Sequence, residues 1–81
     1  METIHLDDFL DKGILKEEYF RKKVNTINWD SYSNKKVLIK GCASAPIPTW
    51  AYMIIASKLT DYAKLILYGE ACSAFEIYKN K

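Results

Sequence analysis

The sequence predicts a small α/β protein, a βαβ-containing sheet of about three strands with two N-terminal helices packed on it. The chain has 81 residues, which is enough for one domain and too few for two. Apolar residues make up 49% of the chain and charged residues 27%, a composition typical of globular proteins. After residue 34, apolar runs alternate with a helical pattern. We therefore expect a single domain over residues 1–81, with a helical part at 1–33 and a strand–helix–strand core plus a C-terminal strand at 34–81.

The N-terminal part has the pattern of two helices. Leu6, Phe9 and Leu10 would share one face of a short first helix, and Gly13 stands where a C-terminal cap is expected. A second helix is predicted over about 16–25, because acidic side chains lead it and basic side chains follow, as the helix dipole favours.

The segment 28–34 is rich in turn residues and is predicted to be a loop. It carries two aromatic side chains, Trp29 and Tyr32. We expect them to fold back over the core as a lid. The alternative is that they form an exposed contact surface.

The first core strand is predicted at 36–40, a short apolar run with β-branched residues that should be buried on both faces. Two prolines then exclude regular structure from 42–48. Thr49 is expected to cap a helix over 50–59 that is apolar nearly all round and should therefore be buried.

Two further strands complete the predicted sheet. Residues 65–69 form a second buried run, and 75–78 alternate in polarity, as in a strand with one wet face. We expect Ile39, Ile54 and Leu67 to be almost fully buried.

The two cysteines follow the two predicted parallel strands. Cys42 comes soon after the first strand and Cys72 soon after the second. In open α/β sheets, ligands bind in the crevice outside the carboxyl ends of the strands. The sequence therefore predicts that the two thiols are neighbours in this crevice.

Three interpretations of the thiols remain open. Cys42 leads toward a helix N-terminus, which would lower the pKa of its thiol and suit a small thiol enzyme or a persulfide carrier. Together, Cys42 and Cys72 could ligate a soft metal or an iron–sulfur group, and a four-cysteine site would then need two chains. Both could also be small buried apolar residues without a chemical role. The sequence argues against a phosphatase loop, because Pro48 stands where its arginine would be.

Four other side chains belong to the predicted crevice. Ser44, Thr49 and Ser73 could bind an anion or close turns. Glu70 is the carboxylate of this region, and the sequence offers no evident partner for it as a general base.

Charge and hydropathy exclude other classes of protein. The formal net charge is +2, from 12 basic and 10 acidic side chains, so no charge excess supports a strongly electrostatic nucleic-acid binder. The longest apolar stretch, around 50–56, is shorter than the roughly 20 residues that span a membrane. The N-terminus has no signal-like apolar region, so we expect a cytoplasmic protein with reduced cysteines.

Three strings in the chain resemble a bacterial family known only as a domain of unknown function. They are Gly41-Cys42, Pro48-Thr49-Trp50-Ala51-Tyr52, and Tyr68-Gly69-Glu70-Ala71-Cys72-Ser73. The resemblance covers most of the chain and implies relatives of about twice this length with two related halves, so that this chain looks like a single copy. It implies no catalytic residue. It does imply an association with iron–sulfur assembly, which favours the ligation hypothesis.

These observations lead to three hypotheses about function. The first is a non-enzymatic accessory or scaffold protein of metal–sulfur metabolism that uses Cys42 and Cys72. The second is a thiol enzyme or persulfide carrier that uses Cys42, and the third is an interaction module with structural cysteines. A lone βαβ unit with one extra strand leaves a sheet edge and a sheet face uncovered, so we also expect a homodimer.

Overall fold

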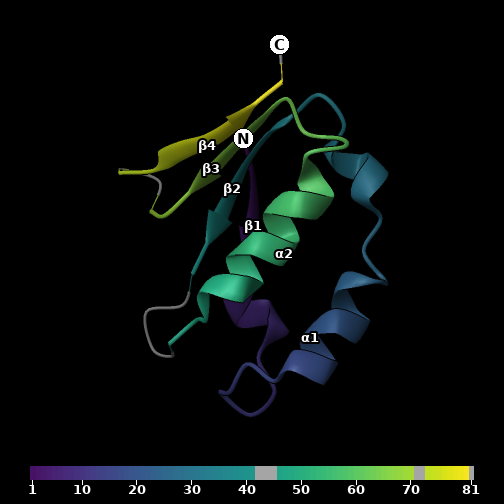
Figure 1. Ribbon diagram of the computed structural model, residues 1–81, viewed down its shortest axis with the longest axis vertical. Helices are drawn as coiled ribbons and strands as arrows, with labels where there is room; N and C mark the ends of the chain where they lie inside the picture. Colours follow the sequence, from purple (N-terminus) through teal and green to yellow (C-terminus); the bar gives the residue numbers. More distant parts are fainter. Residues whose placement is uncertain (42–45, 71–72, 81) are drawn as a thin grey trace.

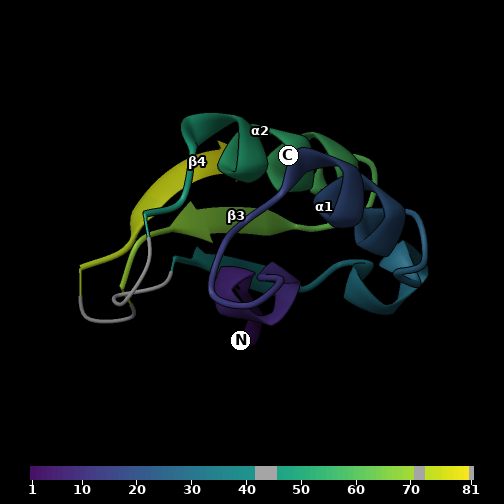
Figure 2. The ribbon, with the colours of Figure 1, turned by 90° about the horizontal axis from the view of Figure 1, so that it is seen from below.

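A four-stranded sheet organises the computed structural model, which describes residues 1–41, 46–70 and 73–80. Both α-helices of the described part lie on the same side of this sheet (Figures 1 and 2). The elements in chain order are β1 (Glu2–His5), the 3₁₀ helix η1 (Leu6–Phe9), α1 (Glu17–Val24), the 3₁₀ helix η2 (Trp29–Tyr32), β2 (Lys36–Lys40), α2 (Thr49–Leu59), β3 (Leu65–Tyr68) and β4 (Phe75–Lys79).

The strand order explains why both helices share one face. The strands lie in the order β1-β2-β3-β4, with β1, β2 and β3 parallel and β4 antiparallel to β3. Crossovers between parallel strands are nearly always right-handed, so successive crossovers in one direction place their helices on one face. Within the described residues, no α-helix lies on the other face of the sheet, and below it is called the helix-free face.

The predicted pair of N-terminal helices is wrong, and so is the predicted number of strands. The start of the chain forms β1, where Ile4 pairs with Ile39 of β2. Leu6–Phe9 makes a single 3₁₀ turn, and Gly13, with φ of 79°, shapes a turn that joins Asp11 to Ile14. The strand depends on pairing with a distant segment, which a local pattern cannot reveal. The second predicted helix is confirmed as α1.

The core lies between the sheet and the helices. β2 is buried on both faces, as predicted, and Ile39 is fully buried. Ile54 and Leu67, however, are only partly buried. Ile54 lies beside, and not on, the buried stripe of α2, while Leu67 pairs with Leu38 on the helix-free face.

α2 is a surface helix and not the fully buried one that its composition predicts. Its buried positions are Ala51, Ile55 and Leu59, a single stripe at helical spacing, while Met53 is 65% exposed. The helix begins at Thr49 itself, and no side chain caps it. Of the predicted loop before it, residues 46–48 are irregular and 42–45 lie outside the described residues.

The aromatic segment before β2 packs on the core, in line with the lid interpretation. The segment forms the short helix η2 instead of a plain loop. Trp29 and Tyr32 are partly buried, with their ring centroids 5.9 Å apart. The Trp29 Nε1 donates a hydrogen bond to the Val24 carbonyl oxygen at 3.3 Å, which ties η2 to the end of α1.

Candidate crevice at the ends of the parallel strands

The segments that follow β2 and β3 are joined at the carboxyl end of the sheet. The backbone N–H of Gly69 donates to the carbonyl oxygen of Ile39 at 3.1 Å. The ammonium group of Lys40 lies 3.6 Å from a carboxylate oxygen of Glu70, and both side chains are partly exposed. Exposed ion pairs of this kind contribute little to stability, so the backbone bond is the firmer tie.

A shallow hollow of about 320 Å³ lies at this end of the sheet, and below it is called the crevice. Its walls come from the ends of β2 and β3, from α2 and from the start of β4. The residues that line it are Gly41, Tyr52, Tyr68, Gly69, Glu70, Ser73 and Phe75.

Two tyrosine rings build one wall of the crevice. Tyr52 of α2 and Tyr68 of β3 meet edge to face, with centroids 5.1 Å apart and planes at 89°. Gly41 lies directly against Tyr52, because a Cβ added at Gly41 would lie 2.1 Å from the tyrosine oxygen. A side chain at position 41 would therefore force the Tyr52 ring to move from this place.

The structure brings some of the predicted site residues together. Glu70 and Ser73 line the crevice as expected. Thr49 lies in a neighbouring hollow of about 410 Å³, which shares Tyr52 and Tyr68 with the crevice. The remaining candidates, Cys42, Ser44 and Cys72, lie outside the described residues.

Sequence reasoning missed Tyr52 and Tyr68 as crevice residues. A signal existed for Tyr68, because it is the last residue of a parallel strand, where α/β proteins place ligand-binding side chains. Tyr52 had no such signal, since its approach to Gly41 depends on how α2 crosses the sheet.

The described residues offer no metal site of their own. Over residues 1–41, 46–70 and 73–80, no three His, Cys, Asp or Glu side chains come together to hold a metal ion. Glu70 is already paired with Lys40.

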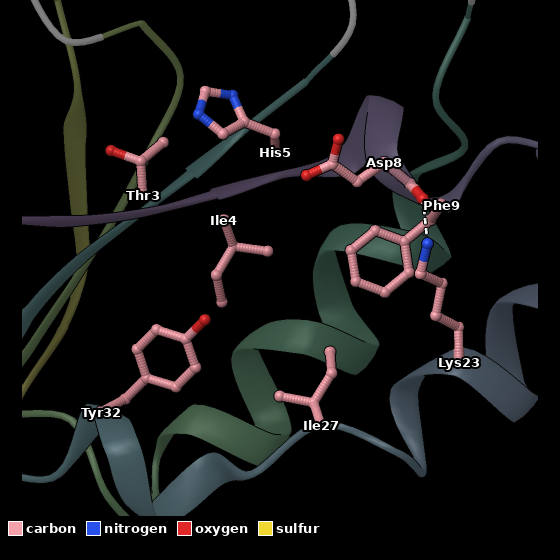
Figure 3. Close-up of a pocket in the computed structure, with 8 residues that line it drawn as sticks. All are labelled: Thr3, Ile4, His5, Asp8, Phe9, Lys23, Ile27 and Tyr32. Carbon is pink, nitrogen blue, oxygen red and sulfur yellow. Dashed lines mark hydrogen bonds between the residues drawn. The ribbon is translucent and has the colours of Figure 1, made fainter.

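A third hollow, of about 370 Å³, lies between β1, η1, α1 and η2. Figure 3 shows the Tyr32 hydroxyl pointing toward Ile4, and the Lys23 ammonium group reaching the backbone oxygen of Asp8. This ammonium group also lies 5.6 Å from the centroid of the Phe9 ring. The Lys23 ammonium group therefore already has partners within the protein. The hollow offers an anionic ligand less positive charge than its lining residues suggest.

Tyr32 is a proton donor at neutral pH. Burial raises the pKa of its hydroxyl above the usual value of 10, and the nearby carboxylate of Glu2 raises this pKa further. The hydroxyl can therefore donate a hydrogen bond but does not serve as a base.

The fold and the crevice define a small α/β protein with a one-sided sheet and a hollow at the ends of its parallel strands. A protein-family comparison matches residues 3–80 to DUF2480, described as a protein of unknown function. The chain belongs to this family, which confirms the resemblance to an uncharacterised family. Comparisons with curated proteins and with solved structures gave no match. No described helix is long and apolar enough to cross a bilayer.

Proposed function

We propose that this protein is a small non-enzymatic accessory protein that holds a thiophilic metal ion or metal–sulfur group at the crevice, with Cys42 and Cys72 as ligands. One observation carries the proposal: residues adjacent to both cysteines line the same hollow. Gly41 directly precedes Cys42, and Ser73 directly follows Cys72. Thiolates are the ligands that soft metals and iron–sulfur groups select.

The ligand count determines the form of the site. The chain has two cysteines. A tetrahedral thiolate site takes four, so a complete site would join two chains, whereas one chain alone would leave open positions for an exchangeable ligand. Either arrangement suits a protein that stores or hands over a metal rather than one that catalyses a reaction.

Metal binding by cysteine variants tests the proposal. Protein purified anaerobically would be titrated with Zn²⁺ and with Fe²⁺ against a chromophoric chelator, as wild type, Cys42→Ser, Cys72→Ser and the thiol-free double variant. We expect each single variant to bind at least about tenfold more weakly, because a lost thiolate cannot be replaced by a hydroxyl. The matched control is Ser57→Ala, which removes an exposed hydroxyl on α2 outside the crevice and no thiol, and which should bind as wild type does. Equal binding by wild type and the thiol-free variant would refute the proposal.

The same variants separate this proposal from a thiol enzyme or persulfide carrier. If Cys42 is a nucleophile, iodoacetamide should label it with an apparent pKa below about 8.5, and no metal should compete with the labelling. If both thiols resist labelling until the protein unfolds, neither hypothesis holds. The third hypothesis, an interaction module, would then be favoured by the exposed apolar side chains beside β4.

A further inference from the structure

Exposed apolar side chains gather beside β4, and together they are called the β4 surface below. Its members are Met53, Tyr68, Phe75 and Ile77, which are 65%, 40%, 68% and 48% exposed. All but Phe75 line the hollow of about 410 Å³ against α2, and Phe75 lines the adjoining crevice. Contiguous exposed apolar side chains are typical of interaction surfaces.

β4 is also a free edge of the sheet. In the described part of the chain it pairs only with β3 (Figure 1). Its outer edge therefore carries unpaired backbone N–H and C=O groups, which another strand can satisfy. An apolar surface beside an open strand edge favours a partner that adds a strand.

A bulge sets the direction of the β4 side chains. Tyr78 pairs with Ile66 and Glu76 pairs with Leu67, so Ile77 is the extra residue between them. Tyr78 packs against the core, and Ile77 lines the hollow against α2, so both lie on the helix side. Glu76 and Lys79 lie on the helix-free face. Their partners in β3 are Leu67 and Leu65, which alternate along the strand with the helix-side residues Ile66 and Tyr68.

We propose that a second copy of this chain docks on the β4 surface through antiparallel pairing of the two β4 strands. Residues directly opposite each other in such a pair share a face of the sheet. In one register, each β4 side chain lies opposite a side chain on the same face of the sheet. In this register Glu76 of each copy lies opposite Lys79 of the other, and Ile77 lies opposite Tyr78. A shift by one residue would place the charged Glu76 opposite the core-facing Tyr78.

The charges favour a copy of the same chain over an unrelated partner. The two-fold axis repeats the Glu76–Lys79 contact, so each negative group meets a positive one on the helix-free face. On the helix side, this register places Ile77 and Tyr78 of the two copies next to the two-fold axis, and Phe75 of each copy lies farther out along the strand. The helix-free face itself suits a second copy less well, because it carries the charged side chains of Lys36, Glu76 and Lys79, which would lose water on docking.

A charge exchange at β4 tests the proposal. Sedimentation equilibrium would be run on the wild type, Glu76→Lys, Lys79→Glu and the double exchange, with far-UV circular dichroism to check that each variant folds. We expect wild type to have the mass of two chains at micromolar concentration. Each single variant should weaken association at least about tenfold, because like charges then face each other twice. The double exchange should restore it.

An apolar pair of variants provides a matched control. Ile77→Asp should abolish association, while Ile14→Asp, at a position 60% exposed outside the β4 surface, should leave it unchanged. All measurements would be repeated in the Cys42→Ser/Cys72→Ser background, so that they do not depend on metal binding or on disulfides. A monomeric wild type at about 100 μM, or a double exchange that stays monomeric, would overturn the proposal. So would a dimer that the β4 variants leave intact and Leu67→Asp disrupts.

Discussion

At the scale of single residues, Tyr32 couples its ionisation to folding. The side chain packs against the core beside Trp29, and Ile4 lies in front of its hydroxyl (Figure 3). Water is partly excluded there, which disfavours the charged phenolate, and the Glu2 carboxylate adds repulsion. The folded protein therefore holds this proton more tightly than the unfolded chain does.

The stability of the protein should depend on pH, because the pKa of Tyr32 differs between the folded and unfolded states. The pKa of Tyr32 is raised in the folded state, so the unfolded chain loses the proton first as pH rises above about 10. The free energy of unfolding should therefore fall as pH rises through 10 and stop falling, for this group, once pH passes the folded pKa. Urea unfolding of wild type and Tyr32→Phe between pH 9 and 11.5 measures this fall in the free energy of unfolding. The variant should lose less stability over this range, and an identical fall in both proteins would contradict the assignment.

At the scale of the elements, α2 shows how a uniformly apolar helix can still have an inside and an outside. Its buried stripe presses on the sheet through Ile55, which is fully buried. Ile54, the preceding residue, is only partly buried. The two residues have the same side chain and lie in the same helix. Comparing them therefore measures how much side-chain burial contributes to the free energy of unfolding.

Truncating the two isoleucines should give unequal losses of stability. Ile55→Ala should lower the free energy of unfolding by about 2–5 kcal/mol, because it leaves a cavity under α2. Ile54→Ala should cost under about 1.5 kcal/mol, because the side chain is partly exposed and water can enter the space that its truncation leaves. The gain in helix propensity is the same in both variants and cancels in the comparison. If Ile55→Ala fails to fold, Ile55→Val, at about 0.5–1.5 kcal/mol, keeps the comparison measurable by urea unfolding.

Similar losses for Ile54→Ala and Ile55→Ala would mean that α2 is buried all round, as its composition alone suggests.

At the scale of the whole molecule, both described α-helices cover the same side of the sheet, and the strands should differ in local stability. β2 is hydrogen-bonded on both sides and buried on both faces. β1 and β4 are the two edges of the sheet. Opening an edge strand exposes less apolar surface than opening the centre, so the edges should open more often.

Amide hydrogen exchange should rank the strands accordingly. We expect the slowest exchange in β2, at rates set by global unfolding, and faster exchange in β1 and β4. The amides of β1 should nevertheless exchange more slowly than those of residues 12–16, because β1 pairs with β2. Exchange in β1 as fast as in an open loop would contradict its place in the sheet. Addition of a second β4 strand, as in the proposed dimer, should slow exchange in β4 at high protein concentration.

Much of the core part was predictable because its signals are local. The strands β2, β3 and β4 were found from short apolar or alternating runs, and α1 from its order of charges. The expectation that Glu70 and Ser73 would share a crevice followed from the parallel arrangement of two strands alone. The predicted neighbourhood of Cys42 and Cys72 stays a prediction.

After residue 16, the sequence by itself determined which segments form the α-helices and strands, though not the 3₁₀ helix η2, since periodicity and end signals act over a few residues. The tertiary structure alone decided that Glu2–His5 is a strand, that the sheet is one-sided, and that Leu67 lies on the helix-free face. It also decided that Tyr52 closes on Gly41. Each of these depends on contacts between segments that are far apart in the chain, and such contacts are selected by packing and strand direction rather than by local preference.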